Sequence, residues 1–80
     1  MVISKENLTL QFGKHIRDLR LKKGLTQLEL AAITGKDRQS IQRVESGNVN
    51  STLYYMYELA EGLETDLATL IAFGSNENKS

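Results

Sequence analysis

The stretch TQLELAAITGKDRQSIQRVESG, residues 26–47, decides the fold. It opens with T-x-x-E, a capping box, which predicts that a helix begins at Gln27. Gly35 ends this helix, because glycine adopts the positive φ of a sharp turn without steric cost. Asp37 is a good N-cap for a second helix, which we expect to end near Gly47. The stretch therefore predicts two short helices joined by about three residues.

The packing that such a pair requires is also visible in the stretch. Ala31 lies four positions before Gly35, and it must be small because the second helix crosses close to it. Ile41 and Val44 are the apolar residues that hold the second helix against the first. These two anchors define the buried side of the second helix, and its polar residues are left to face outward.

Apolar residues recur at helical spacing on both sides of this pair. We expect one helix over residues 10–23, one that starts at Ser51 or Thr52, and a short one over residues 67–72, which Asp66 caps. The apolar faces of the first two are expected to consist of Phe12, Ile16 and Leu19, and of Leu53, Met56, Ala60 and Leu63. The predicted fold class is therefore all-α, a compact five-helix domain.

The 80 residues suffice for one domain, which we place at residues 9–73. We expect residues 1–8 to form a loosely ordered N-terminal arm and residues 74–80 to form a disordered polar tail. The chain has no cysteine and one histidine, so the sequence offers no disulfide and no cluster of metal ligands. We expect no metal, no cofactor and no enzymatic activity. Since there is neither an apolar run of roughly 18 residues nor a signal-peptide pattern, we expect a cytoplasmic location and no membrane partner.

The formal net charge is zero, but the charges are segregated along the chain. Residues 14–43 carry eight Lys and Arg against three Asp and Glu, whereas residues 44–80 carry one against six. A basic half beside an acidic half suits a protein that meets phosphates with one face only. Uneven surface charge is also common without such a partner, so this pattern alone does not decide the function.

The exposed side of the second helix carries groups that suit the edges of DNA bases. The side chains expected there are Arg38, Gln39, Gln42, Arg43 and Ser46. In the major groove glutamine can bond adenine, and arginine can bond guanine, each in bidentate fashion. A carboxylate on this face would be repelled by phosphates, and the face contains none. The alternative is an ordinary solvated helix face, which more often includes glutamate. We predict that the first four of these residues read bases.

The pair and its neighbours resemble the phage repressor and Cro-type helix-turn-helix family of transcriptional regulators over residues 12–71. The resemblance includes the leading FGKHIRDLRLKKGLTQ and the trailing L-x-x-M-x-x-L-A-x-G-L. It implies a lambda-repressor-like fold, with the helix-turn-helix in the second and third helices. The sequence departs from the family at Thr34 and Lys36, where apolar side chains are usual, and at Ser51 and Gly62, where Pro and Ala are frequent. We expect the Lys36 stem to cover the core with its ammonium group outside.

Contacts to DNA phosphates position such a domain without specifying sequence. The residues predicted to make them are Thr26, Gln27, Lys36, Asn48, Asn50 and Ser51. Backbone amides near Thr26 and Gln27 form an anion site at a helix N-terminus, and Thr26 can cap the helix as well. The resemblance implies that Gln27 clamps a phosphate. It also implies a partly buried salt bridge between Arg20 and Glu45, which we interpret as structural.

A homodimer seam is predicted on the helices that follow the pair. Tyr54 and Tyr55 are expected to point outward, and exposed aromatic residues are enriched at interfaces. The residues predicted for the seam are Tyr54, Tyr55, Leu70 and Phe73. Alternatively, Leu70 and Ile71 complete the core of the monomer and the tyrosines have no such role. The sequence leaves both interpretations open.

The favoured function is a sequence-specific regulator of transcription, most simply a repressor, that reads the major groove of double-stranded DNA with its third helix. It would bind a palindromic operator as a homodimer, with the two reading helices about 34 Å apart. The alternative is an antitoxin, which binds a toxin protein as well as DNA. Antitoxins usually carry a dedicated toxin-binding extension, whereas the tail here is about seven polar residues.

Overall fold

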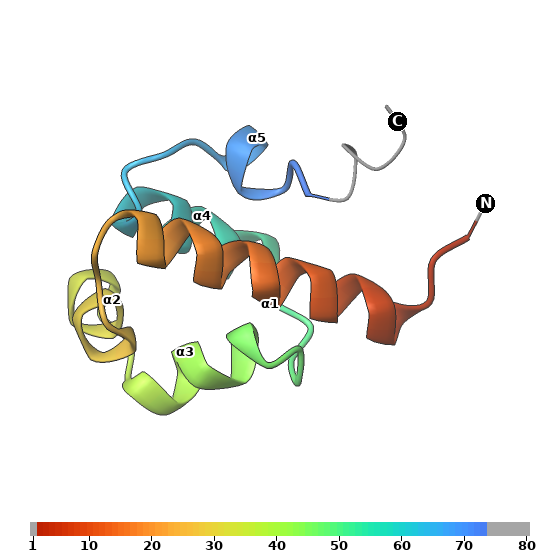
Figure 1. Ribbon diagram of the computed structural model, residues 1–80, viewed down its shortest axis with the longest axis horizontal. Helices are drawn as coiled ribbons and strands as arrows, with labels where there is room; N and C mark the ends of the chain where they lie inside the picture. The colour runs from red at the N-terminus through yellow and green to blue at the C-terminus, as the bar shows by residue number, and fades with distance from the viewer. Residues whose placement is uncertain (1, 74–80) are drawn as a thin grey trace.

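Helices alone make up the regular structure of residues 2–73, the part of the chain that the computed structural model describes. In chain order they are α1 (Lys5–Lys22), α2 (Gln27–Thr34), α3 (Arg38–Glu45), α4 (Leu53–Gly62) and α5 (Leu67–Leu70), as Figure 1 shows. The predicted all-α, five-helix fold is confirmed. No helix within residues 2–73 is long and apolar enough to cross a membrane.

Side-chain caps set the points where the short helices begin. The Thr26 hydroxyl accepts the N–H of Glu29, and the Glu29 carboxylate accepts the N–H of Thr26, which completes the predicted capping box. Asp37 and Thr52 cap α3 and α4 with a single bond each, accepting the N–H of Ser40 and of Tyr55. Gly35 ends α2 with a φ of 70°, as its position in the sequence predicted.

Helix α1 begins at Lys5 rather than at residue 10, so its predicted start was wrong. Ser4 is its N-cap, and the Ser4 hydroxyl accepts the N–H of Asn7 at 3.1 Å. Residues 5–8, expected to belong to the N-terminal arm, are therefore helical. The early start was missed because apolar spacing was the guide, and Leu8 in this part of α1 is 44% exposed. The tail predicted at residues 74–80 lies outside the described residues.

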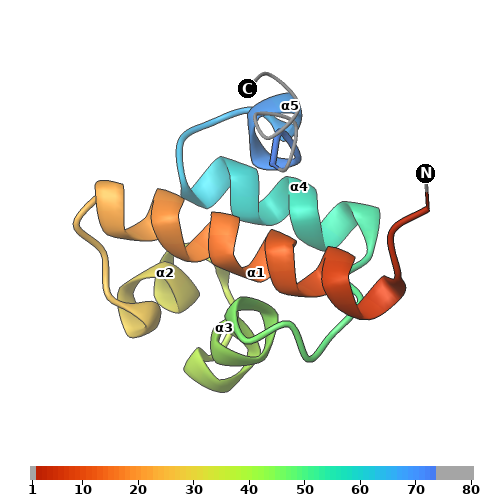
Figure 2. The same ribbon diagram turned by 45° about the vertical axis from the view of Figure 1, so that its right-hand side comes forward.

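Helix α1 runs through the middle of the molecule, with α3 on one side and α5 on the other (Figures 1 and 2). Each helix contributes one large, fully buried side chain to the core: Ile16, Leu30, Ile41, Leu59 and Leu70. Leu53, predicted on the inner face of α4, is instead 65% exposed. It is the first residue of α4, and the buried stripe of this helix passes through Leu59, Ala60 and then Leu63.

Two glycines allow helices to approach one another closely. A Cβ at Gly13 of α1 would collide with the carbonyl oxygen of Val44 and would lie 2.6 Å from that of Glu45. Helix α3 therefore ends directly on the backbone of α1. At Gly62 a Cβ would collide with the methyl group of Thr34. Thr34 and Gly62 are both positions where the sequence departs from the family it resembles. The two departures compensate each other, because the larger Thr34 faces the smaller Gly62.

Candidate nucleic-acid interface

Helix α3 has one buried and one exposed side, as the sequence predicted. Ile41 and Val44 are 0% and 2% exposed. The four predicted base readers, Arg38, Gln39, Gln42 and Arg43, are all exposed. The one carboxylate within α3 belongs to Glu45, whose side chain is 5% exposed. Asp37 precedes the helix, and its carboxylate accepts the N–H of Ser40 at 2.7 Å. Helix α3 thus turns two amides and two guanidinium groups to the solvent.

A buried ion pair fastens the end of α3 to α1. Arg20 donates through Nε to Glu45 Oε2 at 2.6 Å and through Nη2 to Glu45 Oε1 at 3.0 Å. Its Nη1 donates to the carbonyl oxygen of Leu25 at 2.8 Å. The hydrogen bonds to Glu45 raise the pKa of Arg20, so this side chain stays charged. The salt bridge that the resemblance implied is confirmed, and it holds the reading helix in place.

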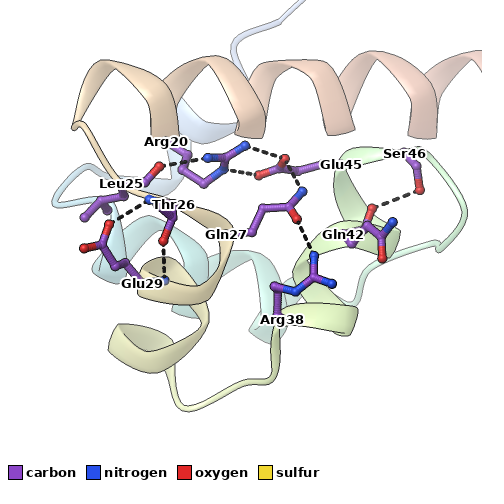
Figure 3. Close-up of polar contacts among 9 residues, drawn as sticks. All are labelled: Arg20, Leu25, Thr26, Gln27, Glu29, Arg38, Gln42, Glu45 and Ser46. Atoms are coloured by element: carbon purple, nitrogen blue, oxygen red, sulfur yellow. Dashed lines mark hydrogen bonds and ion pairs between the residues drawn. The ribbon is translucent and has the colours of Figure 1, made fainter.

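Gln27 connects this ion pair to the exposed face of α3 (Figure 3). Its Nε2 donates to Glu45 Oε1 at 3.0 Å, and its Oε1 accepts Nη1 of Arg38 at 3.3 Å. Four side chains from α1, α2 and α3 therefore form one continuous chain of contacts. The sequence did not indicate this chain of contacts, because it predicted Gln27 and Arg38 as two separate DNA contacts.

The N-terminus of α2 offers two backbone N–H groups to an anion. The first N–H groups of a helix have no partner within the helix. The capping box uses those of Thr26 and Glu29. Those of Gln27 and Leu28 have no hydrogen-bond partner among residues 2–73, and a phosphate oxygen suits them. Thr26 acts here as the cap of the helix.

The segment between α3 and α4 carries further predicted phosphate contacts. Asn48 and Asn50 are exposed, and the amide of Asn48 donates to the Ser46 hydroxyl at 3.0 Å. The Ser51 hydroxyl is buried and has no hydrogen-bond partner among the described residues. A hollow of about 150 Å³ lies here, and its polar lining comes from Ser40, Arg43, Asn50, Ser51, Thr52 and Tyr55. The structure thus brings Asn50 and Ser51 beside Arg43 of the reading helix.

Lys36, a further predicted phosphate contact, is paired within the protein. Its ammonium group donates to Glu58 at 2.6 Å and lies 4.2 Å from the centre of the Tyr55 ring. The Lys36 side chain is 12% exposed, so most of it is covered, and its ammonium group is paired with a carboxylate rather than free. The sequence carries no signal for this contact, because Glu58 follows 22 residues later on another helix.

The residues predicted for a dimer seam divide between the core and the surface. Leu70 is fully buried in the monomer. The sequence left open whether it belongs to the dimer seam or to the core, and the structure places it in the core. Tyr55 was predicted to point outward, but it is half-buried and its hydroxyl bonds that of Ser40. That prediction was wrong because two residues outside α4, Ser40 and Lys36, contact the Tyr55 hydroxyl and ring. Tyr54 is 68% exposed, and Phe73 packs partly buried against the core.

Comparisons with known proteins agree with this arrangement of helices. A family model described as helix-turn-helix matches residues 16–70. A protein of Sinorhizobium fredii, described as an uncharacterized HTH-type transcriptional regulator, is 37% identical over 59 residues, which are 74% of this chain and 77% of that protein. Both matches span the turn between α2 and α3 and most of the helical core.

Solved structures with this fold include controller proteins of restriction-modification systems. C.AhdI from Aeromonas hydrophila is 37% identical with a TM-score of 0.76, and the match covers 78% of this chain and 94% of that one. C.Esp1396I, as a tetramer in complex with its natural 35-base-pair operator, is 30% identical with a TM-score of 0.71, covering 80% and 93%. The chain therefore belongs to the Cro/C1-type helix-turn-helix family of DNA-binding transcriptional regulators, which are not enzymes.

Proposed function

We propose that this regulator recognises its operator with the exposed side of α3, which enters the major groove. The observation that carries the proposal is the composition of that side, with two guanidinium groups, two amides and no carboxylate. Arg38 and Arg43 can each donate two bonds to a guanine, and Gln39 and Gln42 can pair with adenine. A face of this kind can bind both base edges and phosphates, whereas the carboxylate of a glutamate there would be repelled by the phosphates.

Phosphates on either side of the groove then position the domain. On one side lie the free N–H groups of Gln27 and Leu28 at the start of α2. On the other lie the exposed amides of Asn48 and Asn50, and beside them Ser51, whose buried hydroxyl would have to turn outward to reach a phosphate oxygen. We leave Lys36 out of this set, because its ammonium group is already paired with Glu58.

We further propose that the domain acts as a homodimer on a palindromic operator. C.Esp1396I is described as a tetramer on its operator. Two-fold symmetry would place two copies of α3 about one helical turn apart on one side of the duplex. A dimer bound over a promoter keeps other proteins away by its bulk, which is the simplest route to repression.

We propose as the dimer seam an apolar hollow between the start of α1 and the end of the described chain. Leu8, Met56, Ile71 and Phe73 line this hollow of about 340 Å³, here called the Ile71 face. No ionisable side chain lines it, but its rim includes Asn50 and Ser51, so the proposed seam adjoins the proposed phosphate contacts. A second exposed apolar surface, the one predicted from the sequence, surrounds Tyr54, and Glu58 and Glu61 line the hollow beside it. Self-association through that second surface would bring these carboxylates toward their copies, so we place the seam at the Ile71 face.

The test of base reading is a selection of binding sites from random DNA, followed by substitution on α3. We expect an enriched motif for the wild type. Gln39→Ala combined with Arg43→Ala should weaken binding to that motif by about 100-fold or more and leave non-specific binding much less affected. The matched control replaces the same two residue types on α1, as Gln11→Ala with Arg17→Ala, and should keep the preference for the motif. Unchanged binding by the α3 double variant would rule out this role for α3.

A further inference from the structure

We propose that a second face of this regulator, separate from the face for DNA, binds a basic segment of a partner protein by holding an arginine side chain. The site is a hollow of about 350 Å³ between the end of α2 and the exposed side of α4, here called the Tyr57 hollow. Its lining includes Ile33, Tyr54, Tyr57 and Glu61. The proposal does not depend on base reading by α3.

Three large side chains around the Tyr57 hollow are exposed to the solvent. Tyr54 is 68% exposed, Ile33 is 55% exposed and Tyr57 is 47% exposed. Gly62 also belongs to the lining, and it adds no side chain that could fill the hollow. Tyrosine is enriched at protein interfaces, because its ring provides a large contact area at a low entropic cost. The hollow therefore has the composition of a protein-binding surface.

The two tyrosines are held in place before a partner binds. Their rings stack, with centroids 6.2 Å apart and planes inclined by 28°. The Tyr57 hydroxyl donates to Glu61 Oε2 at 3.0 Å, one helical turn further along α4. Because these contacts already restrict both side chains, less conformational entropy is lost when a partner covers them.

The charge of the Tyr57 hollow favours a cation. Glu58 and Glu61 line it, and no lysine or arginine does. Glu58 is paired with Lys36, whereas the exposed Glu61 forms no ion pair within residues 2–73. A carboxylate can accept about four hydrogen bonds, and that of Glu61 accepts one, from Tyr57. These carboxylates would repel the phosphates of DNA, and a second copy of the same face would bring like charges together.

Arginine fits this site better than lysine does. A guanidinium group is planar, so it can stack on a tyrosine ring while it donates to a carboxylate beside that ring. The hydrogen bond between Tyr57 and Glu61 holds such a ring and such a carboxylate side by side. An aliphatic side chain next to the arginine would cover the exposed Ile33. The partner is therefore a protein segment that carries an arginine beside an aliphatic residue.

The Tyr57 hollow and the proposed DNA contacts can be occupied at the same time. No residue that lines the hollow belongs to the proposed base or phosphate contacts. Helix α2 contributes Ile33 and Thr34, at its C-terminal end, to the hollow, and its N-terminal N–H groups are left for a phosphate. These two ends of α2 are about 10 Å apart. The regulator can therefore hold a second protein while it is bound to DNA.

The test titrates the isotope-labelled protein with three short peptides and follows its backbone amide signals by NMR. Each peptide is Gly-Leu-X-Leu-Gly with blocked ends, where X is arginine, lysine or citrulline, the uncharged analogue of arginine. We expect the arginine peptide to shift the signals of Tyr54, Tyr57 and Glu61. It should bind about threefold more tightly than the lysine peptide and about tenfold more tightly than the citrulline peptide.

Substitutions in the hollow test which groups hold the arginine. Glu61→Gln removes the charge at similar volume, and Tyr57→Leu removes the ring but keeps an apolar side chain. Each should weaken binding of the arginine peptide by about fivefold or more. Asp18→Asn, at an exposed residue of α1, changes the net charge by the same amount as Glu61→Gln and should leave binding unchanged. Thermal unfolding checks each variant, and Glu61→Gln decides the result if Tyr57→Leu does not fold.

Three results would overturn the proposal. Equal binding of the arginine and citrulline peptides, or unchanged binding by Glu61→Gln, would show that the hollow does not select a cation. A higher dimer dissociation constant for Glu61→Gln, measured by analytical ultracentrifugation, would make the hollow a contact between copies of this chain. Weaker binding of Glu61→Gln to DNA would place the hollow within the DNA-binding surface. If base reading by α3 fails its own test, these expectations stay the same.

Discussion

At the scale of single residues, the position of the reading face depends on a glycine that is not part of it. Gly13 lies where α1 meets the last turn of α3, against the backbone carbonyls of Val44 and Glu45. Backbone atoms cannot move aside as the end of a side chain can. A methyl group at residue 13 would therefore displace α3 and with it the ion pair between Arg20 and Glu45.

We predict that Gly13→Ala lowers the free energy of unfolding by about 1–3 kcal/mol, although alanine favours helices by about 1 kcal/mol over glycine. Urea denaturation measures this change, and the affinity for the selected operator should fall as well. Lys14→Ala, at the exposed neighbour on α1, is the control and should change the free energy by less than about 0.5 kcal/mol. A Gly13→Ala protein as stable as the wild type would show that the crossing has room for a side chain.

Residues differ in how much of their role the sequence could predict. The buried side of α3 was predictable, because Ile41 and Val44 are three apart on one helix and every other position follows from helical geometry. The contacts of Lys36 were not, since its partner Glu58 is distant in the chain and the pairing depends on how α4 packs. Gly13 gave no signal either, because a glycine at a helix crossing has no local pattern that marks it.

At the scale of elements, α3 is held from two sides. Helix α1 holds its end through the buried ion pair and the close crossing at Gly13. Helix α4 holds its first part, because the hydroxyl groups of Ser40 and Tyr55 bond to each other. The turn before α3 is tied to the same tyrosine ring by Lys36. The reading helix is therefore fixed at both ends before it meets DNA.

We predict that Tyr55→Phe destabilises the domain by about 0.5–1.5 kcal/mol, because it removes one partly buried hydrogen bond and keeps the ring under Lys36. Chemical denaturation measures the loss. Tyr57→Phe on the same helix is the matched control. Its hydroxyl donates at 3.0 Å to Glu61 on the exposed side of α4, and its loss should matter less. Equal losses for both variants would contradict a special role for the bond to Ser40.

Helix starts were predictable where a capping side chain precedes an apolar pattern. This explains why the starts of α2, α3 and α4 were predicted and the start of α1 was not. Thr26, Asp37 and Thr52 precede apolar residues that were already assigned to a helix, so the sequence marked the starts of α2, α3 and α4. Ser4 caps α1 equally well, but the three residues directly after it are polar, so apolar spacing could support the helix only from Leu8 onward. Caps alone are too frequent in loops to decide a boundary.

At the scale of the whole molecule, the segregation of charge has two roles. Three ion pairs within residues 2–73 each join a cation of residues 14–43 to a carboxylate of residues 44–80: Arg20–Glu45, Lys23–Glu64 and Lys36–Glu58. The opposite charges of the two halves therefore help to hold the halves together. The cations outside these pairs include Arg38 and Arg43 on α3, which leaves a smaller basic surface for DNA than the sequence indicated.

The last prediction concerns the assembly of two such molecules. Ile71 is 50% exposed on the Ile71 face, so a change there perturbs a proposed contact and not the core of the monomer. Ile71→Asp would place two carboxylates in an uncharged seam, one from each copy, and should raise the dimer dissociation constant by about 100-fold. Analytical ultracentrifugation measures this, and unfolding of the monomer should change little. Tyr54→Asp, at a residue of α4 that is 68% exposed, should leave the dimer intact. If Tyr54→Asp dissociates the dimer and Ile71→Asp does not, the seam lies on the tyrosine surface instead.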